Sequence, residues 1–277
     1  MQKVCGLYMF ILMGAIPLIG NDILNKKTSF VIVTASYNNK DFYEGNLSSV
    51  FSQNYDNWHL IYINDCSTDG TGQLVQDFID QHKMNDKVTL INNSQRHRHL
   101  YNQYHAIHHC HDNCVVVILD GDDKLAHPEV LTYLNKVYQD PNIWMTYGQF
   151  RFESSGRLGR CVPLPADVVE QNNIRKFKWV TDHLRTFYAG LFKRIKKEDL
   201  MFNGSFFPRC ADVAIMFPMA EMAGEHIKFI PDVLYLYNDK NPIQRRPQER
   251  AFSFMSIKEI RKRQRYDRIK KAPYLSI

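Results

Sequence analysis

The sequence has too few well-placed cysteines for a disulfide framework. It holds six cysteines in 277 residues; Cys5 lies in an apolar N-terminal stretch, and the others are scattered and odd in number. This pattern excludes the small secreted domains that depend on disulfides. Histidines and cysteines between residues 108 and 114 would suit zinc, but no second ligand pair follows at a zinc-ribbon spacing. We therefore do not expect structural zinc.

Several other signatures are also missing. No Gly-x-Gly-x-x-Gly follows the first apolar run, so a dinucleotide-dependent dehydrogenase is not supported. The chain has no recognisable recognition helix, zinc finger or RNA-binding signature, so we expect no nucleic-acid partner. Internal repeats and linkers are absent too, which favours one domain, residues 28–240, with an appendage at each end.

The composition suits a folded domain with a large core. Hydrophobic residues make up 44% of the chain and aromatic residues 13%. The net charge is +6, and much of it lies in a basic C-terminal tail, residues 241–277. The stretch from Lys258 to Lys271 contains eight Lys or Arg residues and only two acidic residues, Glu259 and Asp267. We expect a helix there that contacts anionic lipid or another polyanion, although a solvated terminal helix fits equally well.

Residues 1–27 form an apolar leader. Its residues 4–20 carry no charge, a length between that of a signal-peptide core and a membrane span of roughly 17 to 20 residues. A small-residue cleavage pattern is poorly formed, so we expect an uncleaved signal-anchor and a membrane-associated protein. A cleaved signal peptide and a buried apolar arm are the alternatives. The flanking charges are too balanced to fix the side of the membrane.

From residue 30 onward, apolar runs typical of strands alternate with segments of helical spacing. The expected strands cover residues 30–33, 59–63, 88–91 and 115–119, and the expected helices cover residues 43–51, 74–79 and 101–109. Repeating βαβ units predict an α/β fold with a parallel sheet between layers of helices. After residue 124 the order is mixed: we expect helices at 129–138 and 211–223, a strand at 144–152, a loop at 156–165, and short strands at 227–230 and 233–237.

The most informative feature is the run Asp120-Gly121-Asp122-Asp123 directly after the apolar residues 115–119. Carboxylates packed at the end of a buried strand repel one another unless a cation lies among them. In open α/β sheets the carboxyl ends of strands are where ligands bind. Oxygen ligands of this kind suit Mg²⁺ or Mn²⁺ bridging a diphosphate. A polar turn, or an N-cap cluster for the following helix, is the alternative.

Four motifs then occur in order along the chain. They are Ala35-Ser36-Tyr37-Asn38, the segment Asn64-Asp65-Cys66-Ser67-Thr68-Asp69-Gly70-Thr71, the run Asp120–Asp123, and Ala211-Asp212 before an apolar helix. In this order they resemble the "S-Y-N", "D-D-x-S-x-D-x-T", D-x-D and "E-D" motifs of the family 2 glycosyltransferases. The resemblance covers about residues 28–240. It implies a GT-A fold, with a Rossmann-like nucleotide-binding half, a mixed sheet and an acceptor half.

The resemblance also implies an inverting transferase that uses a nucleotide-sugar and a divalent cation. Asp120 and Asp122 would hold Mn²⁺ or Mg²⁺, which neutralises the diphosphate leaving group. Asp123 would hold a metal-bound water or the sugar hydroxyls. Asp212 would be the base that activates the acceptor hydroxyl; a helix N-cap is its alternative role.

Nucleotide binding is implied at Tyr37, Asp65, Arg96 and Asp120. The Tyr37 ring would stack on a base, the Asp65 carboxylate would accept from a ring N–H, and Arg96 would meet the diphosphate. Each residue also has a purely structural alternative: Tyr37 as a half-buried aromatic, Asp65 as a turn cap and Arg96 as a surface charge. We expect a UDP-sugar, with a GDP-sugar as the second choice, and transfer of a hexosyl or N-acetylhexosaminyl group to a glycan, lipid or protein acceptor.

The chain departs from the family pattern at several positions. Asn64 and Ala211 replace acidic residues, the "A-R-N" stretch lacks its Arg, and the final "Y-R-x-H" stretch lacks its His. The segment His183–Phe187 would supply the missing positive charge or cap a helix. A catalytically inactive GT-A module that binds a nucleotide-sugar or glycan is therefore the alternative function. A nucleotidyltransferase would need a Gly-rich loop after the first strand, which Ser36–Lys40 is not.

Overall fold

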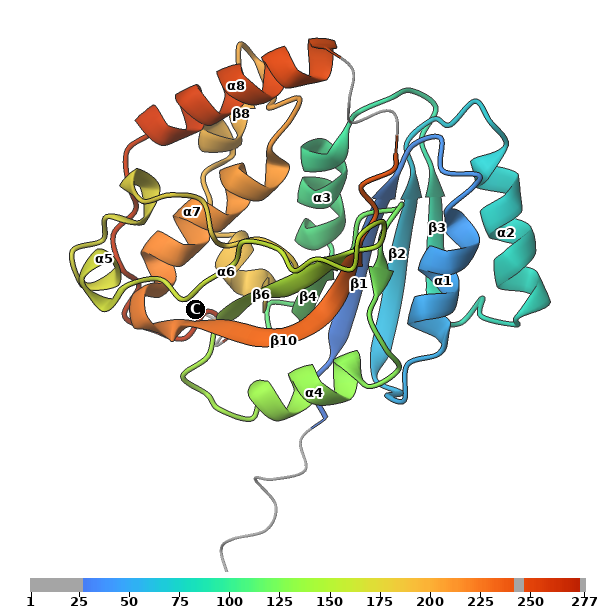
Figure 1. The fold of residues 1–277 in the computed structure, drawn as a ribbon, viewed down its shortest axis with the longest axis horizontal. Coiled ribbons are helices and arrows are strands. Elements are labelled where there is room, and N and C mark those ends of the chain that lie inside the picture. Colours follow the sequence, from blue (N-terminus) through green and yellow to red (C-terminus); the bar gives the residue numbers. More distant parts are fainter. Residues whose placement is uncertain (1–26, 242–246, 275–277) are drawn as a thin grey trace, which may run out of the picture.

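The computed structural model describes residues 27–241 and 247–274 (Figure 1). Its main sheet contains β1 (Phe30–Ser36), β2 (Trp58–Asn64), β3 (Val88–Asn92), β4 (Val115–Ile118), β5 (Lys124–Leu125), β6 (Met145–Phe152), β7 (Arg185–Tyr188) and β10 (Ile227–Tyr237); β8 (Met201–Phe202) and β9 (Ser205–Phe206) form a separate hairpin. The helices are α1 (Tyr43–Phe51), α2 (Thr71–Gln81), α3 (His99–His108), α4 (Val130–Val137), α5 (Ala166–Glu170), α6 (Ala189–Phe192), α7 (Ala211–Ala223) and α8 (Pro247–Lys262). Short 3₁₀ turns cover Ile174–Lys176, Lys197–Leu200 and Gly224–His226.

The strands of the main sheet lie in the order β3-β2-β1-β4-β7-β6-β10-β5. β3, β2, β1 and β4 are parallel, as the βαβ pattern predicts. β7 then runs antiparallel to both β4 and β6, and β5 pairs antiparallel with β10. The α/β fold is confirmed, and the carboxyl ends of the parallel strands meet at one edge of the sheet (Figure 1).

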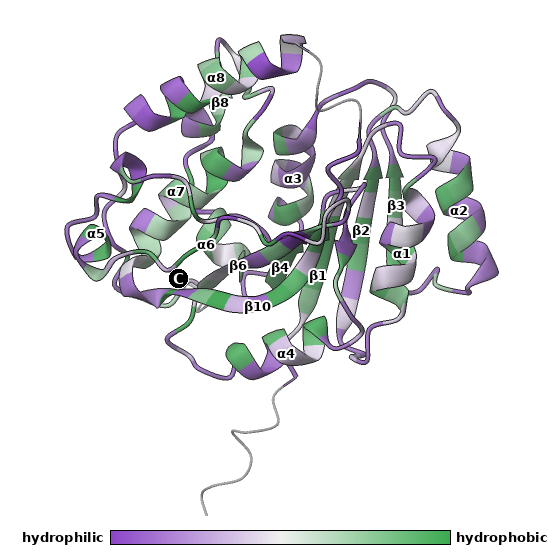
Figure 2. Ribbon diagram, in the orientation of Figure 1, coloured by the Kyte–Doolittle hydropathy of each residue, from purple (hydrophilic) through white to green (hydrophobic). Residues whose placement is uncertain are grey.

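The central strands form because their residues are apolar on both faces. All of β1 and all of β4 are buried, and such continuous apolar runs are typical of parallel strands covered by helices on both sides. Figure 2 shows the hydrophobic colour concentrated on these strands and the hydrophilic colour on the outer loops. β3, at the edge of the sheet, keeps only Val88 buried. The middle of the sheet is therefore more deeply buried than its β3 edge.

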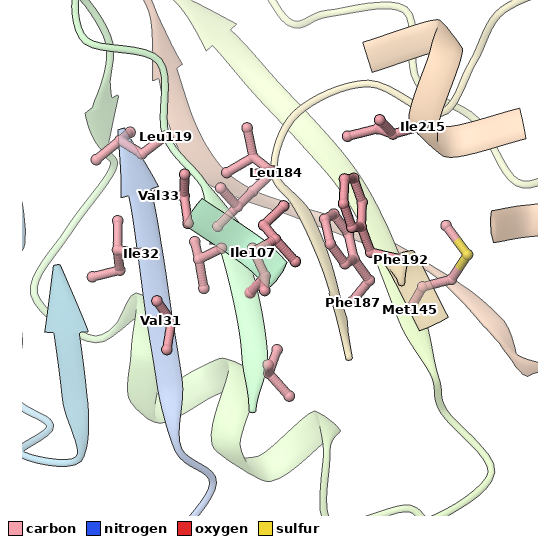
Figure 3. Close-up of a cluster of buried hydrophobic side chains, with 14 of the residues drawn as sticks. Val31, Ile32, Val33, Ile107, Leu119, Met145, Leu184, Phe187, Phe192 and Ile215 are labelled. Carbon is pink, nitrogen blue, oxygen red and sulfur yellow. The ribbon is translucent and has the colours of Figure 1, made fainter. Parts of the chain in front are cut away.

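One cluster of buried side chains joins the two halves of the domain. Val31 of β1, Ile107 of α3, Phe187 of β7, Phe192 of α6 and Ile215 of α7 all belong to it (Figure 3). Each of these side chains is at most 8% exposed. Burial of a large apolar side chain stabilises the fold by roughly 1.5–3 kcal/mol. The parallel half and the mixed half thus form a single packed unit.

α7 is buried along almost its whole length. Every residue from Val213 to Ala223 is buried, which is typical of a helix that is apolar all round. Glu221 is the one charged residue in this buried stretch. It forms a buried ion pair with Arg175, in which Arg175 Nη2 lies 2.7 Å from Glu221 Oε2. The apolar burial fixes the direction of α7, and so it fixes where the first turn, with Asp212, points.

The structure differs from the expectation at β10 and at the C-terminal tail. The two strands expected at 227–230 and 233–237 are one strand, β10, with irregular register on either side of Val233. Pro231 lies in this irregular stretch; it cannot donate a backbone hydrogen bond, which explains the interruption in the pattern.

The basic tail is helical only in part. α8 begins at Pro247 and ends at Lys262, so the helix expected from Lys258 to Lys271 is wrong beyond Lys262. Tertiary contacts replace helical bonds there: the Tyr266 N–H donates to Glu221 Oε2 at 3.0 Å, and the Tyr266 hydroxyl donates to Asp199 Oδ2 at 2.5 Å. In the described ranges, no helix combines the length and apolar character needed to cross a membrane. The leader lies outside these residues, apart from Lys27.

Candidate functional site

A pocket of about 280 Å³ opens at the carboxyl edge of the sheet. Its walls come from the ends of β1, β2 and β4, from α3, from β7, from the first turn of α7 and from α8. This is the edge at which open α/β sheets bind ligands. The pocket brings together most of the residues predicted from the sequence: Tyr37, Asp65, Arg96, Asp120, Asp122 and Asp212 all line it. Asp123 lies behind this wall and is fully buried.

The acidic run forms a tight turn between β4 and β5. The Asp123 N–H donates to the Asp120 carbonyl at 3.0 Å. Asn46 of α1 holds the turn from below, because its Nδ2 donates to the carbonyls of both Asp120 and Asp123. The N-cap of α4 is Glu129, so the acidic run does not cap that helix.

Gly121 is required at this turn for steric reasons. A Cβ at this position would lie 2.7 Å from the Ser36 Cβ and 2.9 Å from the Ser36 Cα. We expect Gly121→Ala to lower the free energy of unfolding by about 1–3 kcal/mol, as overpacking does. Chemical denaturation would measure this loss. Gly45→Ala is the matched control, because its Cβ would meet only the flexible end of Lys124 and alanine favours helix α1. Equal stability of the two variants would contradict the steric account.

The carboxylates of the turn differ in their electrostatics. Burial raises the pKa of Asp122, and the neighbouring Asp120 raises it further. Burial together with Asp122 and Asp120 holds the pKa of Asp123 well above its usual range. Burial would also raise the pKa of Asp120, but the charges of Arg185 and His99 outweigh it and bring that pKa below its usual value. Asp120 is therefore ionised, beside two carboxyl groups that resist ionisation.

The chemistry of this group fits a divalent cation in part. Oxygen atoms of Asp120 and Asp123 and a nitrogen of His183 lie within 4.8 Å of one another. Both Asp123 oxygens already accept hydrogen bonds, from the Tyr235 hydroxyl at 2.6 Å and the Asn238 N–H at 2.6 Å. Asp122 Oδ2 accepts from Asn241 Nδ2 at 2.7 Å. Carboxylate oxygens are what Mg²⁺ and Mn²⁺ prefer, and a cation would relieve the repulsion that raises these pKa values.

Arg185 links the two halves of the pocket. It is 3% exposed and lies at the start of β7, so residues 185–187 of the segment His183–Phe187 belong to a strand, and the segment does not cap a helix. Its Nη2 lies 3.5 Å from Asp120 Oδ2, and its Nη1 lies 3.6 Å from Asp212 Oδ2. One buried guanidinium therefore faces both the acidic turn and the predicted base. The segment supplies positive charge, one of the two roles expected for it.

His183 orients Arg185 and is neutral. Burial and the Arg185 charge lower the pKa of His183 to about 4. The Arg185 Nη2 donates to His183 Nδ1 at 2.9 Å, since a guanidinium has no acceptor atom. The proton of the neutral ring is therefore on Nε2, which lies 3.2 Å from Asp182 Oδ1. The ring stacks on Tyr235, with centroids 4.3 Å apart. These contacts fix the guanidinium in place.

Asp212 lies in the first turn of α7. Cys210 is the N-cap residue and makes no side-chain capping bond, so Asp212 is not the N-cap that the sequence also allowed. Burial raises the pKa of Asp212, Arg185 opposes that rise, and Asp182 adds to it. A carboxylate with a raised pKa is a stronger base than a solvated one.

Two of the predicted nucleotide-binding residues, Tyr37 and Arg96, are in direct contact. The Arg96 guanidinium lies over the Tyr37 ring, 3.8 Å from its centroid. The Asp65 carboxylate accepts from the N–H groups of His97 at 2.8 Å and Arg98 at 2.7 Å. Asp65 is 3% exposed, and it positions the loop that carries Arg96. Tyr37 and Arg96 form one wall of the pocket, with Asp65 as its support.

With the site in place, the chain can be compared with known proteins. The sequence model of glycosyl transferase family 2 matches residues 31–198. The chain belongs to glycosyl transferase family 2. TuaG of Bacillus subtilis (strain 168), named as a glycosyltransferase of teichuronic acid biosynthesis, is 29% identical over 100 residues, 36% of this chain and 38% of TuaG. EpsE of the same organism, named as a glycosyltransferase, is 29% identical over 108 residues, 39% of this chain and 37% of EpsE.

Solved structures show the same fold. TarS 1–349 of S. aureus in complex with UDP-GlcNAc aligns with a TM-score of 0.58 and 16% identity, over 77% of this chain and 59% of that one. PcManGT, a mannosyltransferase from Pyrobaculum calidifontis in complex with GDP-Man and Mn²⁺, aligns with a TM-score of 0.56 and 20% identity, over 85% of this chain and 66% of that one. The chain spans less than two fifths of the two Bacillus relatives. At these identities the structures establish the GT-A fold alone.

Other pocket residues of this family 2 chain were missed by the sequence reasoning. His99 Nδ1 lies 3.7 Å from Asp120 Oδ1. Arg98 and Arg209 line the pocket and both face Glu249 of α8, at 3.2 and 3.4 Å. Asn241 reaches Asp122 from beyond β10. Charged side chains scattered between motifs carry no signal of their own, because only the fold brings them together.

Proposed function

We propose that this protein is an inverting glycosyltransferase that moves a sugar from a nucleotide-sugar to an acceptor hydroxyl. The observation that carries the proposal is one buried guanidinium, Arg185, with Asp120 at the acidic turn on one side and Asp212 on the other. In the proposed reaction the first carboxylate acts on the side of the leaving diphosphate, and the second acts on the side of the attacking hydroxyl. In-line displacement needs these two functions on opposite sides of the sugar.

The base in this mechanism is Asp212. It takes the proton of the acceptor hydroxyl as that oxygen attacks the anomeric carbon, a role worth roughly 10² to 10⁴ in rate. Arg185 favours the ionised form of Asp212, because its charge opposes the larger effect of burial, which raises the pKa. One displacement inverts the anomeric configuration, so an α-linked donor gives a β-linked product.

The leaving group collects negative charge as the bond breaks. Asp120 and Asp122 are the residues that would hold a divalent cation, which supplies electrostatic stabilisation of the diphosphate when bound. Arg96 and Arg209 line the same pocket and add positive charge from the protein itself. Arg185 orients Asp120 through its Nη2. The protein groups thus preorganise the field in which the charge develops.

We propose a UDP-sugar as the donor, with a GDP-sugar as the alternative. TarS is solved with UDP-GlcNAc and PcManGT with GDP-Man and Mn²⁺, which supports this class of donor. Calorimetric titration with UDP- and GDP-sugars in Mn²⁺ tests it, with Tyr37→Ala as a variant that should weaken binding. If no nucleotide-sugar binds with or without metal, the proposal fails. The acceptor is a glycan, lipid or protein, and the uncharged stretch 4–20 supports association with a membrane.

The role of Arg185 gives a prediction about pH. Because Arg185 lowers the pKa of Asp212, Arg185→Gln should raise that pKa. The acid limb of the pH profile of donor turnover should therefore move to higher pH, because Asp212 must be ionised to act as a base. Measuring turnover of a soluble donor from pH 5 to 9 tests this, with the exposed Arg151→Gln on β6 as control. A uniform loss with an unchanged profile would show that Arg185 acts only structurally.

A further inference from the structure

The outer face of α8 exposes two large apolar side chains to solvent. Phe254 is 75% exposed, and Ile257, three residues later on the same face, is 37% exposed. The inner face is packed: Ser256 and Ile260 are each 1% exposed. Phe254 has the largest exposure among the large hydrophobic side chains noted on the described surface. Exposure of such a ring to water is unfavourable, so contact with an apolar partner would stabilise this face.

Basic side chains border the same face. Arg250 lies four residues before Phe254, Lys258 four residues after it, and both are exposed. Farther along, Lys262 and Arg265 are exposed as well. Glu259 is already paired with Lys262, at 2.8 Å. An exposed aromatic ring between cations is the composition of a helix that lies in the surface of an anionic bilayer.

α8 also forms part of the pocket. Ser253 lines it, and Glu249 in the first turn of the helix faces Arg98 and Arg209, which line it too. In Figure 1 α8 lies along the top of the molecule, on the side to which the carboxyl ends of β2 and β3 point. A surface in contact with the outer face of α8 would therefore lie beside the pocket.

We propose that the outer face of α8 is a binding surface for an anionic lipid bilayer. Phe254 and Ile257 enter the interface, and Arg250 and Lys258 face the headgroups. A second copy of the chain is a poorer occupant, because a symmetric contact would place the cations of one copy opposite the cations of the other. The inference does not depend on the transferase activity. It places the pocket next to lipid headgroups, where a lipid-linked acceptor would be presented.

The test is a fluorescence measurement on the full chain with Phe254→Trp. On vesicles with brominated acyl chains and anionic headgroups, the emission added by the new Trp should be quenched and shifted to shorter wavelength. Asp77→Trp is the control, because Asp77 is exposed on α2, which lies apart from both α8 and α4 in Figure 1. Its added emission should not be quenched, even if another part of the chain also binds the vesicles.

Charge and salt give a second readout. Arg250→Gln together with Lys258→Gln should weaken the insertion of α8 by roughly 30-fold, because each basic residue near an anionic surface contributes about 1 kcal/mol. High salt should weaken it likewise. Three results would overturn the proposal: no quenching at position 254 on anionic vesicles, equal quenching at 254 and 77, or a concentration-dependent blue shift at 254 without vesicles. The last would show that a second copy covers this face.

Discussion

Asp212→Asn should lower sugar transfer by at least about 10²-fold while nucleotide-sugar binding stays close to that of the unchanged protein. The amide keeps the size of the side chain and can still accept a hydrogen bond, but it cannot take a proton from the acceptor hydroxyl. Asp212 is not the N-cap of α7, so the substitution removes no capping bond. Single-turnover assays and calorimetry would measure transfer and binding separately.

Asp167→Asn is the matched control for this experiment. Asp167 also lies in the first turn of a helix, α5, but it is exposed and does not line the pocket. Its loss should leave both transfer and binding unchanged. If Asp212→Asn reduced binding and transfer in parallel, Asp212 would be a structural residue. If transfer were unchanged, another group would be the base. If the unsubstituted protein bound nucleotide-sugars but transferred no sugar, it would be the inactive binding module that is the alternative function.

Asp122→Asn should have opposite effects on activity and stability. Transfer should fall roughly 10²- to 10³-fold, the range for removing one preorganised electrostatic partner. Without metal, the free energy of unfolding at neutral pH should rise, because burial and Asp120 raise the pKa of Asp122 and so make its ionised form unfavourable in the folded protein. The amide oxygen can still accept from Asn241. Thermal unfolding in chelator and transfer assays in Mn²⁺ would measure the two effects.

The sign of the pH dependence follows from the raised pKa. A carboxyl group whose pKa is raised by folding contributes stability at acid pH, and that contribution is lost as pH rises through the folded pKa. The stabilising effect of Asp122→Asn should therefore be small at acid pH and grow toward neutral pH. Asp86→Asn, at an exposed position, is the control and should show no such trend. Destabilisation by Asp122→Asn at neutral pH would contradict the repulsion account.

The sequence predicted the first half of the fold well, for a physical reason. Each strand from β1 to β4 is a short apolar run bounded by polar residues, and parallel strands follow one another through helices. Tyr37 and Asp65 come directly after β1 and β2, and Asp120 comes two residues after the end of β4. Their meeting in one pocket then follows from the topology alone.

The second half could not be predicted in the same way. β7 pairs antiparallel between β4 and β6, and nothing in residues 185–188 shows which strands are its neighbours. The position of Arg185 between Asp120 and Asp212 depends on that pairing. β10 also continued past Pro231, and α8 began well before the basic cluster, because tertiary contacts outweighed the local pattern.

Spacing in the sequence brought the three carboxylates of the acidic turn together but did not predict the partners of each one. The sequence predicted that Asp120, Asp122 and Asp123 would hold the metal or its water. In the folded chain the Asp123 carboxylate accepts hydrogen bonds from the Tyr235 hydroxyl and the Asn238 N–H. Asp122 is directed to Asn241. Asp120 and Asp122 line the pocket, whereas Asp123 is fully buried behind it. Oxygen atoms of Asp120 and Asp123 still lie within 4.8 Å of each other, so metal binding by all three carboxylates stays a prediction.

The central claim is a single displacement at the anomeric carbon by this pocket, and one measurement tests it most directly. The protein is incubated with α-linked UDP- and GDP-sugars in Mn²⁺, water serves as the acceptor, and the first sugar released is followed by proton NMR before mutarotation. We predict that one donor releases its nucleotide and that the β-anomer appears first, with the rate lost in Asp212→Asn. Release of the α-anomer first, or no release from any donor, would contradict the claim.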